Sequence, residues 1–202
     1  MRIIVTIPPA SEPVALTEVK KHLRLATTTV AAEAYTTEDD LLNRLIMTAR
    51  IQVEQETGRA LITQTRTLYL DAWPNKNYIN LPYPTLQSVV ITYWLNTDTG
   101  YDNTLSTVDA DIVSEPGRVI LQPDESWPSG SLYTDKPVKV EFVCGYGDVA
   151  AAVPASIRSA ILLKISDLYE NRGEVVMGVS VSRIQNAVDS LLRSFCIHTR
   201  FE

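Results

Sequence analysis

The chain has 202 residues, of which 45% are hydrophobic and 21% are charged, and its formal net charge is −6. This composition is typical of a globular protein with one domain or two small ones. Such a protein buries a sufficient core without disulfide bonds. Cys144 and Cys196 lie far apart in the sequence, and His22 and His198 are the only histidines. No zinc-ligand spacing exists, so we expect no metal and no cofactor, and free buried thiols are favoured over a disulfide.

The negative charge is concentrated in the middle of the chain. Residues 1–60 carry seven basic and eight acidic side chains, residues 61–150 carry five and eleven, and residues 151–202 carry six and five. An acidic segment repels the phosphate backbone, so the middle is not expected to bind nucleic acid directly. A solvated acidic face that keeps the protein in solution explains the same charges.

The first segment has the pattern of neither a signal peptide nor a membrane span. Its apolar run, RIIVTI, is short and is followed by three prolines within residues 8–13. Such a segment is too short and too interrupted for either role. We expect a cytoplasmic protein without a membrane partner, in which residues 2–7 form a short strand or an extended arm.

A short helix is predicted over residues 17–25. Thr17 has the residue type of an N-cap, and the helix would bury one apolar stripe. The members of that stripe are Leu16, Val19 and Leu23, with Leu25 as a further candidate. Residues 26–37 show no periodicity and are predicted to form a loop.

A long helix is predicted over residues 37–61. Thr37 is expected to cap its first turn with Asp40 as the reciprocal partner, and Gly58 is expected to end it in the left-handed conformation. One stripe of the helix is apolar and is therefore predicted to be buried. It consists of Leu41, Leu42, Leu45, Ile46, Ala49 and Val53.

Two further apolar residues of this helix lie nearly opposite the stripe. Met47 and Ile51 are one turn apart, among Arg44, Glu54 and Gln55. Single exposed apolar side chains are ordinary, so this pair has a neutral interpretation. The alternative is that the helix contacts two bodies, the core of its own domain and a neighbouring protein.

From Leu61 onward the periodicity changes from helical to alternating, and Pro and Asn punctuate the chain. Short strands are predicted between these turns. Their ranges are 63–70, 78–81, 88–95, 108–113, 118–121 and 138–143, and residues 96–103 are predicted to form a turn. Strands at this spacing favour a small antiparallel sheet or a partial barrel.

Helical periodicity returns after Gly147. Pro154 suits the first turn of a helix that Gly173 can end, and its apolar surface is wide enough to predict enclosure on more than one side. Leu163 lies outside even that surface. A last helix is predicted after Ser182, its N-cap, and the tail of residues 196–202 is predicted to be mobile without a partner.

These elements predict an α+β fold, in which N- and C-terminal helices form a helical bundle around a β-rich antiparallel middle. We expect one domain over residues 1–202, helical in 1–60, β-rich in 61–148 and helical with a C-terminal tail in 149–202. Strands rarely alternate with helices in this order, which disfavours a doubly wound parallel sheet.

No catalytic signature is present in the sequence. The glycine pair of Cys144–Ala150 lacks the third glycine and the helix start of a dinucleotide loop. Asp124 and Glu125 offer paired carboxylates, but they lie in a proline-flanked turn, which explains them without chemistry. We therefore predict a protein that is not an enzyme.

In their order, several segments resemble the head-tail connector (adaptor) proteins of long-tailed bacteriophages. They are PVALTEVKKHLRL, DDLLNRLIMTARIQVEQETGRAL, QTRTLYLDAWP, INLPYPTLQSV, VEFVCGYGD and PASIRSAILLKISDLYENRG. Together they span roughly Pro13 to Gly173, and the ETGRAL and LYENRG endings are their more specific parts.

The resemblance implies a structural subunit that assembles into a ring, commonly of twelve copies, beneath the portal protein of the phage head. Such a ring extends the DNA channel and receives head-completion or tail proteins. DNA would pass without specific binding, for which the acidic middle is suited because it repels phosphate at short range. The implied location is the head-tail junction of the virion, and during assembly it is the host cytoplasm.

Carried over by position, the resemblance assigns the long helix and residues 154–172 to a helical bundle that forms the ring. From their positions off the main apolar surfaces of these helices, we predict that Met47, Ile51 and Leu163 lie in the subunit interface. The segment from Arg193 to Glu202 would be a portal-facing tail, with Arg193, Phe195, Ile197, His198, Arg200 and Phe201 as its contact residues.

Two other classes of function stay open at this point. A small binding or regulatory module of a bacterial or prophage system would be favoured by a defined dimer and an isolated ligand pocket. An enzyme would require a metal- or cofactor-dependent activity that is lost on changing Asp124 and Glu125.

Overall fold

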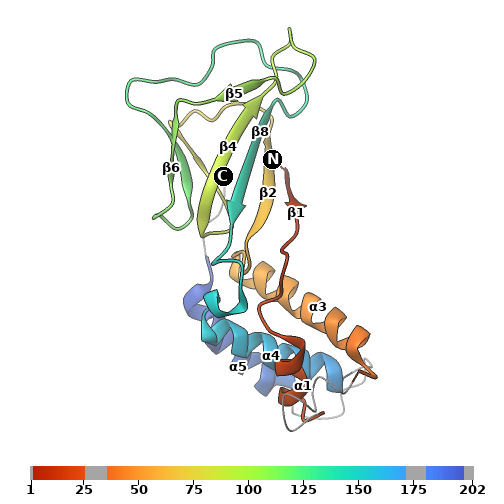
Figure 1. Cartoon of the computed structure of the whole chain (residues 1–202). Coiled ribbons are helices and arrows are strands. Elements are labelled where there is room, and N and C mark those ends of the chain that lie inside the picture. Colours follow the sequence, from red (N-terminus) through yellow and green to blue (C-terminus); the bar gives the residue numbers. More distant parts are fainter. Residues whose placement is uncertain (1, 26–35, 172–180, 198–202) are drawn as a thin grey trace. The chain divides into compact units, whose positions relative to one another are not determined.

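The computed structural model describes residues 2–25, 36–171 and 181–197 (Figure 1). These residues form two compact units. The first, which we call the sheet unit, takes its described residues from Met1–Ala10 and Thr63–Tyr146. The second, the helical unit, takes them from Ser11–Ile62 and Gly147–Ile197. Neither unit is one continuous stretch of chain, and the prediction of a single domain over residues 1–202 stays a prediction.

The sheet unit contains a five-stranded antiparallel sheet (Figure 1). In spatial order its strands are β1 (Arg2–Ile7), β2 (Gln64–Leu70), β8 (Val138–Cys144), β4 (Leu86–Tyr93) and β5 (Asn103–Leu105). The residues 2–7 are thus a strand, not an extended arm, and they form one edge of this sheet. The central strand β8 pairs with β2 and β4, which come from segments far from it in sequence.

One face of this sheet is apolar because alternate residues of β8 point to the same side. Val138, Val140, Phe142 and Cys144 are all buried. Val140 pairs with Leu68 on one side and with Ile91 on the other, and all three side chains are almost fully buried. This row forms the middle of the core of the sheet unit.

A second antiparallel sheet has three strands, in the order β3 (Tyr78–Asn80), β7 (Arg118–Leu121) and β6 (Val108–Asp111). Ile79 and Val119 pair in register and are both buried. In β7, Val119 and Leu121 alternate with half-buried neighbours, which is the pattern of a strand with one face in a core.

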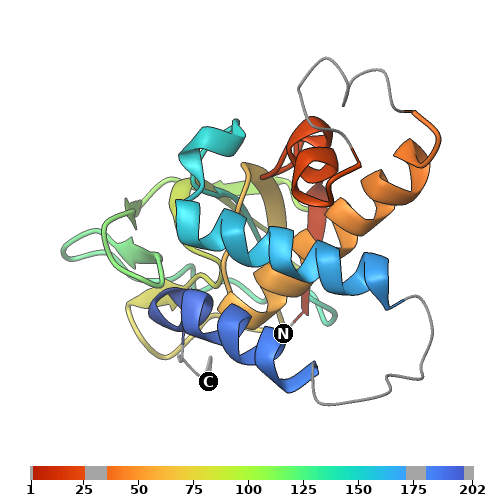
Figure 2. The same cartoon turned by 90° about the horizontal axis from the view of Figure 1, so that it is seen from below.

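The helical unit contains α1 (Leu16–His22), α3 (Asp39–Thr57), α4 (Ala155–Glu170) and α5 (Val181–Leu192), with short 3-10 turns η1 (Ala150–Ala152) and η2 (Arg193–Phe195). In Figure 2, α4 crosses α3 and has α5 beside it, and α4 packs on α3, α5 and α1. The buried apolar side chains of these helices are Val19, Leu42, Ile46, Ala49, Val53, Ile157, Ala160, Ile161, Ile165, Val188 and Leu192. The predicted enclosure of α4 on more than one side is confirmed.

The predicted helical bundle of N- and C-terminal helices is wrong. The described residues instead form a mixed structure of four α-helices and two antiparallel sheets with eight strands. Two physical reasons account for the error. The first segment of the chain is β1, which belongs to a sheet, and α1 has seven residues, roughly 10 Å of helix, which is too short to run along the 19-residue α3. The β-rich antiparallel middle is confirmed.

The predicted helix caps are correct at one end only. Gly58 follows α3 with φ of 67°, the left-handed conformation that glycine adopts easily. The N-cap residues are Glu38 for α3 and Ala15 for α1, and neither makes a side-chain cap hydrogen bond. Thr37 and Thr17 are therefore not caps, because each helix begins at a different residue from the one predicted. Likewise α5 begins at Val181, before Ser182.

The six predicted strands are all present, with ends displaced by at most two residues. The strand β5 was missed: its first residue, Asn103, was placed in a turn and the next two were assigned to no element, because three residues carry no alternating pattern. Gly173 and residues 198–202 lie outside the described residues. Within the described ranges, no helix has the length and apolar content required of a membrane span.

Candidate functional site

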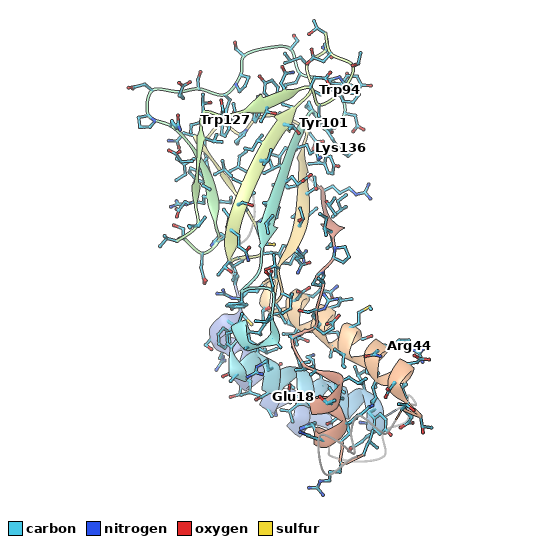
Figure 3. All side chains as sticks on the ribbon, viewed as in Figure 1. Glu18, Arg44, Trp94, Tyr101, Trp127 and Lys136 are labelled. Atoms are coloured by element: carbon cyan, nitrogen blue, oxygen red, sulfur yellow. The ribbon has the colours of Figure 1, made fainter. Side chains whose placement is uncertain are left out.

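The helix α3 presents a small apolar patch to solvent. Met47 is 50% exposed and Ile51 is 41% exposed, although both are large apolar residues. Arg44, Thr48 and Gln55 flank them on the same side of the helix and are also exposed. We call these five residues the α3 outer face; Figure 3 shows Arg44 projecting from it. The prediction that Met47 and Ile51 lie off the buried stripe is confirmed.

Ion pairs and hydrogen bonds fix both ends of α3 to other parts of the helical unit. At its N-terminal end, Lys20 of α1 pairs with Asp39 at 2.6 Å, and the buried position of Lys20 shields this pair from water. Tyr169 of α4 donates a hydrogen bond to Glu38 at 2.6 Å. At the other end, Lys164 of α4 pairs with Glu56 at 2.6 Å. The outer face is therefore carried by a helix that cannot easily shift.

A buried charge cluster stabilises the C-terminal half of α3. Arg50 donates to Glu12 at 2.8 Å and to Glu54, four residues along the helix, at 3.3 Å. The second oxygen of Glu54 accepts a hydrogen bond from the backbone N–H of Leu61 at 3.0 Å. Glu54 thus connects the helix to the chain that follows Gly58. The apolar stripe did not reveal this cluster, since charged residues were expected on the solvent side.

The segment 193–197, which the resemblance assigned to a portal-facing tail, is attached to the end of α3. Arg59 donates from Nε to the carbonyl oxygen of Phe195 at 2.6 Å, and the backbone N–H of Ile197 donates to the carbonyl of Thr57 at 3.0 Å. Arg193 is exposed, whereas Phe195 and Ile197 are half-buried. Whether these residues face a portal stays a prediction. His198, Arg200 and Phe201 lie outside the described residues.

The third predicted interface residue, Leu163, lies on α4. It is half-buried, so it is less accessible than Met47 and Ile51. The three residues come from two helices that pack on each other, α3 and α4. No observation assigns them to an interface, and that role stays a prediction.

An open depression of about 310 Å³ lies between the C-terminal end of α3 and α5. Its lining residues are Glu56, Asp189, Leu192, Arg193 and Cys196. Leu192 is buried and Cys196 half-buried, so the apolar part of the lining lies below charged side chains. Burial, followed by the nearby carboxylates of Glu56 and Asp189, raises the pKa of the Cys196 thiol. Sequence patterns could not have located this depression, because its walls belong to segments more than 130 residues apart.

The turn between β6 and β7 presents a second apolar feature. Ile112 is 54% exposed and Val113 is 88% exposed. Asp111 orders the turn, because its carboxylate accepts hydrogen bonds from the N–H groups of Val113 and Ser114, from the Ser114 hydroxyl, and from Arg118. The predicted strand 108–113 therefore ends at Asp111. Beyond it, the Asp111 carboxylate, and not a partner strand, accepts hydrogen bonds from the backbone N–H groups. An Asp followed three residues later by Ser was the available signal for this turn.

The same contacts shift the titration of Asp111. The hydroxyl of Ser114, then its backbone N–H and the guanidinium of Arg118, hold the pKa of Asp111 well below its ordinary value. Each of these groups binds the ionised carboxylate more strongly than the neutral acid. The turn is consequently ordered by a charged side chain under all physiological conditions.

Aromatic stacking anchors the loops of the sheet unit. Trp94 stacks on Tyr133 with ring centroids 3.9 Å apart, and Trp73 stacks on Trp127 at 5.0 Å. Tyr101 donates a hydrogen bond to the carbonyl of Lys136 at 2.6 Å, and Figure 3 shows both residues beside Trp94. Burial raises the pKa of Tyr101. These tryptophans are thus held by stacking on aromatic residues of other loops and strands.

The described residues show little that would serve catalysis. Within these ranges, no group of three His, Cys, Asp or Glu side chains is arranged to hold a metal ion. Asp124 and Glu125 are both exposed, in the turn where they were predicted. Cys144 and Cys196 are free cysteines; Cys144 is buried as predicted, whereas Cys196 is only half-buried.

No protein-family model and no curated protein sequence matches this chain. Solved structures do. The chain is similar to a chain in the neck of an empty gene transfer agent (GTA) particle, whose structure was computed with C6 symmetry. The TM-score is 0.80 and the sequence identity is 19%, and the match covers 100% of this chain and 99% of that chain. It has the fold of a gene transfer agent neck chain.

Two further structures have chains of the same fold. A chain of the virion of a native GTA particle has a TM-score of 0.78 and 20% identity, and it covers 100% of this chain and 99% of its own length. A chain of the neck of the native particle, computed with C12 symmetry, has a TM-score of 0.70 and 18% identity and covers 98% of each chain. The fold is therefore shared over the full length, whereas membership of the connector family stays a prediction.

Proposed function

We propose that this chain is a non-catalytic structural subunit of a ring in the neck of a phage-like particle. The observation that carries the proposal is the full-length similarity in fold to chains from GTA necks, in structures computed with C6 and C12 symmetry. A subunit of a rotationally symmetric ring repeats one contact around an axis. A ring of twelve copies is the form that we expect.

The α3 outer face supports this assignment. A subunit of a stable oligomer exposes, when it is alone, the apolar side chains that its neighbours bury. Met47 and Ile51 are exposed apolar side chains of this kind on a fixed helix. We propose that the subunit contact includes Met47, Ile51 and Leu163. An enzyme would instead need a constellation of catalytic groups, and a regulatory module would need an enclosed ligand pocket.

The ring is further proposed to dock under the portal protein, to extend the DNA channel and to receive head-completion or tail proteins. The sequence resemblance supports this part of the proposal. Residues 2–10 and 63–146 of the sheet unit carry six basic and ten acidic side chains. An acidic surface lets DNA pass without binding, because phosphate is repelled at short range. The location would be the head-tail junction of the virion, after assembly in the host cytoplasm.

Native mass spectrometry and negative-stain imaging test the proposal. The chain is measured alone at high concentration and again after mixing with the portal protein of the same particle. We expect rings, at the latest when the portal is present. A chain that remains monomeric in both conditions would overturn the assignment, and a closed dimer would favour the regulatory module instead.

A further inference from the structure

We propose that the α3 outer face of one copy inserts into the depression between α3 and α5 of the next copy. The occupant of the depression is thus a second copy of this chain, with Met47 as the inserted side chain. This inference rests on the proposed ring, and it specifies which two surfaces make the repeated contact.

The two surfaces lie on opposite sides of the helical unit. At about 100° per residue, Met47 and Glu56, nine residues apart, point in opposite directions around α3. Met47 belongs to the outer face and Glu56 to the wall of the depression. In Figure 2 the N-terminal half of α3 and the helix α5 lie on opposite sides of α4. One copy can therefore contact a neighbour on each side.

A contact between two different surfaces is the kind that builds a ring. Such a heterologous contact leaves one unused surface on each end of the assembly, so copies add until the circle closes. A contact of the outer face with itself would be isologous and would stop at a dimer. The separation of the two surfaces on one unit is thus what a ring subunit requires.

The chemistry of the two surfaces is complementary. The depression has apolar side chains at its base, Leu192 and Cys196, and Met47 is an unbranched side chain that fills irregular apolar space well. Its volume of about 310 Å³ leaves room for such a side chain. Arg44 accompanies Met47 on the outer face, and two carboxylates, of Glu56 and Asp189, line the depression against one guanidinium, of Arg193, so its lining is negative on balance. Opposite charges at these positions would set the register of the contact.

A single substitution tests the contact, because Cys196 already lies in the depression. In Met47→Cys, each copy carries one thiol on the outer face and one in the depression. Mild oxidation at slightly alkaline pH is followed by non-reducing electrophoresis. We expect a ladder of covalent multimers that ends at the size of the ring. A disulfide forms only when the Cβ atoms come within about 4.5 Å, so the ladder reports direct contact.

Three controls sharpen the result. The ladder should disappear in Met47→Cys with Cys196→Ser. His22→Cys places a thiol at an exposed position on α1, outside both surfaces, and should give no ladder. Arg44→Glu and Asp189→Arg should each weaken association by roughly fivefold, the upper range for a surface pair, and the double variant should restore it.

Different outcomes overturn different statements. Dimers that persist without Cys196 would show that the outer face pairs with itself, which overturns this contact. Rings in native mass spectrometry without any disulfide between positions 47 and 196 would overturn the contact and leave the ring proposal intact. A chain that is monomeric in every condition, with portal protein included, would overturn both.

Discussion

Arg59 and Phe195 are joined by a hydrogen bond of 2.6 Å, from the guanidinium Nε to the backbone carbonyl oxygen. This bond connects the chain just after α3 to the chain just after α5. Together with the bond from Ile197 to Thr57, it makes residues 195–197 part of the helical unit. Partners that bind the C-terminal end of the chain would therefore meet a segment with a fixed starting point.

Arg59→Met is expected to destabilise the protein by about 2 kcal/mol, because it removes a charged donor from a nearly buried site and leaves the Phe195 carbonyl unsatisfied. Urea denaturation measures the change in the free energy of unfolding. Arg44→Met is the matched control, since Arg44 is exposed, and should change stability by less than about 0.5 kcal/mol. Equal effects of the two variants would contradict a role for the bond to Phe195.

Glu54→Gln is expected to lower stability by about 3 kcal/mol, because it removes a charged partner from the buried Arg50. The same denaturation experiment measures it. Glu56→Gln changes the partner of Lys164 in a more exposed pair and should lower stability by at most about 1 kcal/mol. A smaller loss for Glu54→Gln than for Glu56→Gln would show that the buried cluster is not the stronger one.

Met47→Lys combined with Ile51→Lys is expected to leave the monomer folded and to prevent ring assembly. Both positions are solvent-exposed in the monomer, so the new charges are hydrated there, but they would be buried in a subunit contact. Circular dichroism checks folding, and native mass spectrometry with portal protein checks assembly. Rings formed by the folded double variant would refute the role of the α3 outer face.

The turn at Ile112 and Val113 is expected to keep its structure below the pH at which ordinary carboxylates are protonated. A lowered pKa in the folded state means that the ionised form of Asp111 is stabilising. This stabilisation is complete above about pH 4, the unfolded value, and is lost as the pH falls through the lower folded value. NMR should therefore show no step in the amide shifts of Val113 and Ser114 near pH 4, whereas Asp111→Asn should displace both shifts at every pH.

The chain is expected to unfold in one transition, as the single-domain prediction requires. Each unit is made from separate stretches of chain, so the helical unit cannot be completed before residues on both sides of Thr63–Tyr146 are in place. Calorimetry tests this by comparing the calorimetric enthalpy with the van't Hoff enthalpy, which agree for a two-state transition. Two resolved transitions would separate the chain into two domains.

Part of the candidate site could be predicted from the sequence. The position of Met47 and Ile51 off the buried stripe follows from helical periodicity alone, which is a local property. The depression could not be predicted, because Glu56 and Cys196 come together only after α3 and α5 have both packed on α4. The ordered turn after Asp111 was mistaken for the end of a strand, because Ile112 and Val113 have strong β propensity. The hydrogen bonds of the Asp111 side chain override that propensity, and they are harder to recognise in a sequence.

The sequence by itself determined the identity and approximate ends of most elements, because periodicity, Gly58 and the proline turns act over a few residues. It did not determine which elements share a unit. Several contacts join residues that are distant along the chain. They are the pairing of β1 with β2, the pairing of β2 with β8, and the buried ion pairs of Lys20 and Arg50. Only the tertiary structure decided these contacts, because each is stabilising only when two distant segments come together. For the same reason, the sequence predicted a helical bundle where the structure has a mixed fold.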